Sequence, residues 1–194
     1  MAFSPERRLR IVRFLTACAV VVSPFMGMPA TQTPGPDAQT ADFNDRIKSY
    51  LTVRDRVDGN GPPLRQTADA AKIVEAQKAL AALIRNARAS AKQGDIFTPA
   101  IEKQFRALLK WETTGPDGAR TKSVILEEKP LVELKVNAEY PAKEPRTTVP
   151  TKVLEVLPAL PKGEGLEYRF VRKHMILLDT RANLIVDFVF NALP

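Results

Sequence analysis

The carboxy-terminal stretch LEYRFVRKHMILLDTRANLIVDFVF, residues 166–190, constrains the fold of this chain more than any other segment. Runs rich in β-branched and aromatic residues are separated by two short polar segments, Arg172–Lys173 and 180–183. This pattern is typical of strands joined by tight turns, and Asn183 tolerates the positive φ that a turn can require. The stretch therefore predicts a three-stranded antiparallel meander. Because both faces are apolar at many positions, we expect helices to cover the sheet.

Two segments upstream of this stretch have the periodicity of amphipathic helices. Apolar residues recur at three- and four-residue steps from Asp42 to Val57, and the glycines and prolines of 58–63 end this pattern. We expect the next helix to begin at Thr67, whose hydroxyl can cap free backbone N–H groups, and to end near Gly94.

A third helix is predicted after a short break. Thr98 is its expected cap, and Pro99 occupies its first turn, where the missing N–H of proline costs nothing. Its apolar residues recur at helical spacing and are expected to face inward, and Trp111 lies at its end. The predicted fold class is therefore α+β, with an N-terminal three-helix layer packed on a small C-terminal antiparallel β-meander.

The chain between the third helix and the meander is predicted to be mostly extended. Residues 121–130 fit either a short helix or a strand. Residues 131–141 alternate between apolar and polar side chains, which predicts a half-buried strand. A proline-rich connector follows, and we expect one or two helical turns within it at 151–157.

The first residues of the chain have the features of a secretory signal peptide. Four arginines and one glutamate precede a short apolar run that ends near Ala30. The run is too short to cross a hydrocarbon core of about 30 Å comfortably. Two alternatives stay open, namely a leader that is retained and a leader that is lipidated at Cys18. The predicted organisation is a signal peptide at 1–30, a flexible lead-in at 31–41, and one compact domain made of a helical part at 42–112 and a β-rich part at 113–194.

Removal of the leader leaves a chain of ordinary charge without cysteine. The leader carries four arginines and one glutamate, so the net charge falls from +7 to +4 over the remaining 164 residues. We therefore expect no nucleic-acid partner, because such proteins concentrate their basic residues in a stripe. The only cysteine is Cys18, so the exported protein is expected to contain no disulfide and no thiolate metal site. We expect no membrane span after cleavage.

The sequence offers few candidates for catalysis. His174 is the only histidine, and the last two strands carry two acids, Asp179 and Asp187. If Asp179 faces Leu184 across the turn, Asp187 lies opposite Ile176, and the two carboxylates do not converge. A buried and unpaired carboxylate is costly, so we expect Asp187 to bind an arginine or a backbone donor, or to face water. We predict no catalytic residue, no metal ligand and no cofactor, and the roles of His174 and Asp187 stay open.

The basic residues of the second and third helices suggest another possibility. They lie towards the ends of these helices, where the helix dipole favours positive charge, and they could also bind an anionic polymer. These residues are Lys78, Arg85, Arg88 and Lys92 in the second helix, and Lys103, Arg106 and Lys110 in the third.

Several motifs resemble those of a family of uncharacterised exported bacterial proteins. These proteins run from a signal peptide through an ARxxAxxGDIFTP segment to a C-terminal hairpin of the form LEYRFVG…ANLIVDF. The matching segments of this chain are FNDRIKSYLTVRDRV, AALIRNARASAKQGDIFTPAIEKQFRALL, VNAEYP and LPALPKGEGLEYRFVRKHMILLDTRANLIVDFVFNALP. The resemblance implies export and no established activity. The family pattern has glycine where this chain has Arg172, and a tight primed hairpin turn favours glycine there.

These observations predict an exported protein, periplasmic or secreted, that acts as a non-enzymatic binding or scaffold domain for a protein or another component of the cell envelope. The alternative is a carboxylate-dependent hydrolase of the cell envelope that uses Asp179 or Asp187 with His174. A third possibility is a weak envelope binder that uses the basic residues of the two helices.

Overall fold

A computed structural model of the chain describes residues 35–59, 69–128 and 130–194, which belong to one compact unit. The predicted leader, including Cys18 and its cleavage point, lies outside the described residues. The same holds for the expected helix cap Thr67.

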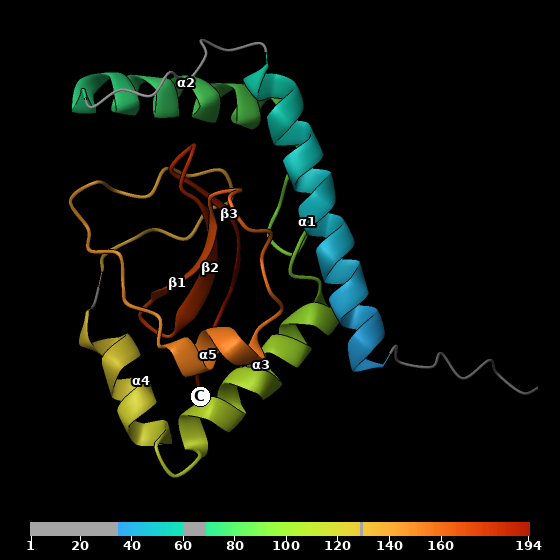
Figure 1. Cartoon of the computed structure of the whole chain (residues 1–194), viewed down its shortest axis with the longest axis vertical. Coiled ribbons are helices and arrows are strands. Elements are labelled where there is room, and N and C mark those ends of the chain that lie inside the picture. Colours follow the sequence, from blue (N-terminus) through green and yellow to red (C-terminus); the bar gives the residue numbers. More distant parts are fainter. Residues whose placement is uncertain (1–34, 60–68, 129) are drawn as a thin grey trace, which may run out of the picture. The chain divides into compact units, whose positions relative to one another are not determined.

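Residues 166–189 form the predicted meander (Figure 1). Its strands are β1 (Leu166–Val171), β2 (His174–Asp179) and β3 (Leu184–Val189), and they pair antiparallel in the order β1-β2-β3. Asn183 has a φ of 51° in the second turn, as expected.

The register of the second hairpin differs from the prediction at one point. Asp179 faces Leu184, but the pairing shifts between Leu177 and Leu178, so that Asp187 lies opposite Leu177 and not Ile176. Such an irregularity places an extra residue in one strand and bends it locally.

Helices pack together in the N-terminal part, and two shorter helices follow before the sheet. The helices are α1 (Pro36–Asp58), α2 (Ala70–Ala87), α3 (Pro99–Thr114), α4 (Gly118–Glu127) and α5 (Thr151–Val156). Helix α1 contacts α2 and α3, and α3 also contacts α4 and α5. The fold class is α+β, as predicted.

Three helix boundaries differ from the prediction. Helix α1 begins at Pro36, inside the predicted lead-in, because a proline at the first position and Asp37 in the first turn both favour a helix start. Helix α2 is capped by Asp69, which accepts from the N–H groups of Ala71 and Lys72. It ends at Ala87, before Gly94, which adopts a φ of 91° in the loop that follows.

The start of α3 is confirmed. Pro99 is its first residue, and the Thr98 hydroxyl accepts from the N–H of Ile101. Most of residues 121–130, which fitted a helix or a strand, lie in α4.

Residues 131–141 have the predicted alternation of side chains but do not form the predicted strand. Val132, Leu134 and Val136 are more buried than the polar residues between them, so the predicted alternation is present. However, only Glu139 forms a bridge with β3, opposite Leu184. The segment is extended, but an apolar face alone does not supply a strand partner, and only its end reaches the edge of β3.

The sheet carries apolar side chains on both faces, but the helices expected to cover it contribute to the core on one face only. One face joins the helices in a large core that includes the aromatic cluster Phe43, Phe97, Phe105 and Tyr168, with ring centroids 5.2–6.4 Å apart. The other face packs in a smaller core with Tyr140 and the extended segment. Helix α3 contributes Ile101, Phe105 and Leu109 to the large core.

Candidate functional site

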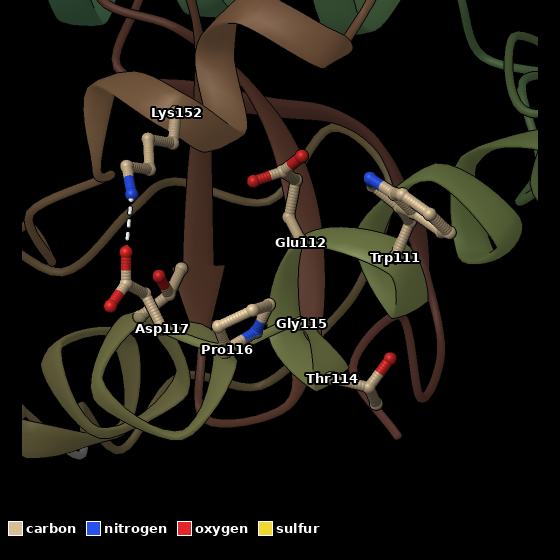
Figure 2. A pocket seen from close by; sticks show the side chains of 9 residues that line it. Trp111, Glu112, Thr114, Gly115, Pro116, Asp117 and Lys152 are labelled. Carbon is tan, nitrogen blue, oxygen red and sulfur yellow. Dashed lines mark hydrogen bonds and ion pairs between the residues drawn. The ribbon is translucent and has the colours of Figure 1, made fainter.

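A hollow of about 260 Å³ lies where α3 ends and α4 begins, and Figure 2 shows its lining. Helix α5 closes one side of it through Lys152. The lining residues are Trp111, Glu112, Thr114, Gly115, Pro116, Asp117, Gly118, Thr121 and Lys152.

The corner between α3 and α4 is tight for local reasons. Pro116 cannot continue α3, and the N–H of Gly115 donates to the carbonyl of Trp111 at 3.2 Å to close the last turn. Gly118 then approaches the backbone of Thr113 so closely that a Cβ on it would lie 2.4 Å from the Thr113 carbonyl carbon. The sequence Gly-Pro-Asp-Gly therefore holds the two helices at the corner, with the hollow beside it.

Trp111 is the most exposed large apolar side chain among the described residues. It is 77% exposed, whereas its neighbours Leu109 and Thr113 turn inward and are buried. Tryptophan is mostly buried in folded proteins, and an exposed indole is common at binding surfaces. It is the only tryptophan of the chain.

Charged groups of both signs surround the hollow. The Lys152 ammonium donates to the Asp117 carboxylate at 2.8 Å, as the dashed line in Figure 2 shows. This hydrogen bond and the attraction between the charges lower the pKa of Asp117 and raise the pKa of Lys152, so both groups are charged at neutral pH.

Glu112 gives the hollow an excess of negative charge. It lies in the last turn of α3, which contains no basic residue. The C-terminal end of a helix carries a partial negative charge and normally favours a lysine or arginine there. Lys152 donates to Asp117 and also lies near enough to Glu112 for that carboxylate to help raise the pKa of Lys152. The lining therefore carries two carboxylates against one ammonium, and this excess, together with the end of α3, attracts a positive group.

The structure does not bring His174, Asp179 and Asp187 together. His174 and Asp179 are the first and last residues of β2, and a strand of this length separates them by roughly 17 Å. The Nδ1 atom of His174 accepts from the N–H of Asn191 at 2.9 Å, and its ring meets the Phe190 ring edge-on. Burial and the charges of Lys173 and Arg172 lower the pKa of His174.

Asp179 is buried within a set of internal bonds. It accepts from the Tyr50 hydroxyl at 2.7 Å and pairs with the buried Arg54 guanidinium at 3.4 Å. Its other oxygen accepts from the N–H groups of Arg181 and Ala182 in the turn after β2. Asp179 therefore joins α1 to the sheet.

Asp187 binds backbone donors, one of the alternatives that we expected. Its carboxylate accepts from the N–H groups of Gly94, Ile96, Phe97 and Phe188 at 2.8–3.1 Å. Burial raises the pKa of Asp187, and these backbone hydrogen bonds oppose that rise. The carboxylate fixes the loop between α2 and α3 on β3.

Two of the basic residues considered for anion binding are engaged inside the fold. Arg85 donates to the carbonyl of Asn137, and Arg88 donates to the Asn137 side chain and lies 5.0 Å from the centre of the Tyr50 ring. Lys78 and Lys92 remain exposed on α2 or just after it. The basic residues of this helix therefore do not form one continuous exposed stripe.

Residue types alone did not identify the Trp111 hollow. The available signal was a tryptophan and a glutamate in the last turn before the helix-ending Gly-Pro pair, separated from it by two threonines, where a basic residue is the usual choice. Lys152, in contrast, reaches the site from a helix that follows a long connector.

Within residues 35–59, 69–128 and 130–194, no group of three or more histidine, cysteine or acidic residues is arranged to hold a metal ion. No helix in the same part of the chain has the length and apolar character needed to cross a membrane. Comparison of the chain with protein-family models, curated proteins and solved structures finds no match.

Proposed function

We propose that this protein is an exported, non-enzymatic binding domain and that the hollow beside Trp111 receives a cationic group of its ligand. The observation that carries the proposal is the position of Trp111. The side chain is 77% exposed at the rim of a hollow, although an inward position would bury its large apolar surface. Aromatic residues in such positions contribute strongly to binding when a partner covers them.

The charges around the hollow indicate that the ligand carries a positive group. The faces of an indole ring are electron-rich and attract ammonium and guanidinium groups. Glu112 and the C-terminal end of α3 attract the same groups, and no base in the last turn of α3 competes with the ligand. The expected ligand therefore carries a lysine-like or arginine-like group that lies against Trp111 and pairs with Glu112.

The surroundings of Asp179 and Asp187 favour binding over hydrolysis. Both carboxylates are fully buried and hold internal donors, so neither offers a free oxygen to a substrate. A hydrolase that used them with His174 would need these groups within reach of one another.

Fluorescence provides a direct test, because Trp111 is the only tryptophan. The protein is titrated with acetyl-arginine amide and, in parallel, with acetyl-citrulline amide, which has nearly the same shape but no charge. We expect the arginine compound to change the emission of Trp111 at a concentration several-fold lower than the citrulline compound. Equal effects of the two compounds, or no effect of either, would refute the proposal.

Two variants localise the effect. Glu112→Gln removes the carboxylate and is expected to weaken the response to the arginine compound about threefold, as for an exposed ion pair. Glu133→Gln makes the same change at an exposed residue that does not line the hollow, and it is expected to leave the response unchanged.

A further inference from the structure

A second hollow of about 370 Å³ adjoins the first on the side of α4 and α5. Asp117, Thr121 and Lys152 line both hollows, so the ion pair between Asp117 and Lys152 lies at their common border. The remaining residues of the second hollow are Arg120, Val124, Pro150 and Thr151.

The ion pair at the border between the two hollows is weak. The side chains of Lys152 and Asp117 are 60% and 71% exposed, and exposed ion pairs of this kind contribute little to stability. A ligand whose own charged groups pair with Asp117 and Lys152 can therefore replace this ion pair at little cost in the stability of the protein. Because they share Asp117, Thr121 and Lys152, the two hollows adjoin each other and together form one groove.

The second hollow differs from the first in charge. Arg120 is exposed and forms no ion pair with another described residue, although it lies near enough to Asp117 to help lower the pKa of that carboxyl. Val124 is 38% exposed and, with Pro150, adds apolar surface beside it. The second hollow therefore attracts a negative group, whereas the first attracts a positive one.

We infer that the two hollows together bind an extended peptide segment of a partner protein, with a basic side chain at Trp111 and Glu112 and an acidic side chain at Arg120. This inference rests on the proposed function, since it extends the same site. A peptide fits because it presents both charges on one chain, with apolar atoms between them for the surface of Val124 and Pro150. A small amine carries only a positive charge, so it matches only the first hollow.

The test uses acetylated and amidated peptides of the form Arg-(Ala)n-Glu, with one to four alanines, and the full chain as the protein. Each peptide has a partner in which glutamine replaces the glutamate, and Trp111 fluorescence reports binding. We expect one spacing at which the Arg–Glu peptide binds at least about threefold more tightly than its Arg–Gln partner, as for an added ion pair.

The variant Arg120→Gln tests the role of the second hollow separately from the proposed function of the first, because Arg120 lines only the second hollow. The variant is expected to abolish the gain from the glutamate, which is measured within the variant as the ratio of its affinities for each Arg–Glu peptide and the Arg–Gln partner, while arginine peptides still bind. Lys135→Gln removes a positive charge from an exposed residue outside both hollows and is expected to preserve the gain. Circular dichroism confirms that each variant is folded.

Three other outcomes are informative. If arginine peptides bind but the glutamate does not raise the affinity at any spacing, the inference of a peptide-binding groove is refuted and the proposed function stands. If no arginine peptide binds, both are refuted. Tighter binding of a glucosamine tetramer, which carries amines but no acid, than of any peptide would overturn the assignment to a peptide.

Discussion

Arg172 adopts a backbone conformation that an arginine rarely takes. It is the first of two residues that join β1 to β2, and its φ is 57°. A side chain in this region costs about 1–2 kcal/mol, part of which glycine avoids, although glycine also loses more entropy on folding.

Replacing this residue is therefore expected to stabilise the protein. Arg172→Gly should raise the free energy of unfolding in urea by about 0.5–1 kcal/mol. Lys173→Gly is the matched control, because Lys173 does not have a positive φ, and it should lower the stability instead. A loss of stability in Arg172→Gly would contradict the expectation.

The environment of His174 makes stability depend on pH. Its pKa in the folded protein is lowered from 6.5, so the unfolded chain binds a proton more readily than the folded one. The contribution of His174 is therefore complete above the unfolded pKa and is lost as the pH falls through about 6.5 towards the lower folded value. Protonation also removes the lone pair that accepts from Asn191.

The measurement compares urea unfolding at about pH 7.5 and about pH 5.5, on either side of the unfolded pKa. We expect the wild type to lose more stability between these conditions than His174→Gln, which does not titrate. An equal loss in both proteins would assign the pH dependence to other groups.

At the scale of the elements, one buried carboxylate fixes the loop between α2 and α3. The side chain of Asp187 in β3 accepts from three N–H groups of residues 94–97. Asp187→Asn places amide hydrogens against these donors, and we expect it to lower the free energy of unfolding by about 2–4 kcal/mol.

Asp45→Asn is the control for this change, because Asp45 pairs with Lys48 on the exposed side of α1. It should cost less than about 0.5 kcal/mol. A small effect of Asp187→Asn would show that the loop is held mainly by the burial of Ile96 and Phe97.

At the scale of the whole molecule, the first residues predict that the protein is exported. A basic head and a short apolar run predict cleavage near Ala30 and release from the membrane. When the full chain is expressed in a bacterium, the mass of the protein in the envelope fraction should correspond to a chain that begins close to residue 31.

The same measurement distinguishes the alternatives. A mass that still includes Met1 would indicate a retained anchor, and a lipid-sized increase on a chain beginning at Cys18 would indicate a lipoprotein. Cys18→Ser should leave the cleavage unchanged if the leader is an ordinary signal peptide.

Sequence alone determined the features that depend on neighbouring residues. The turns at Arg172–Lys173 and 180–183 separate the three strands, and Thr98 with Pro99 starts α3, because turn and cap chemistry act within a few residues. Side-chain periodicity likewise predicted the α+β class.

Only the tertiary structure decided the features that depend on distant segments. Residues 131–136 have the alternation of a strand but no ladder, because only the end of their segment reaches the edge of β3. Asp187 receives its donors from a loop far away in the chain. The Trp111 hollow likewise requires Lys152 from α5, since local patterns give the type of each element but not which distant side chains meet.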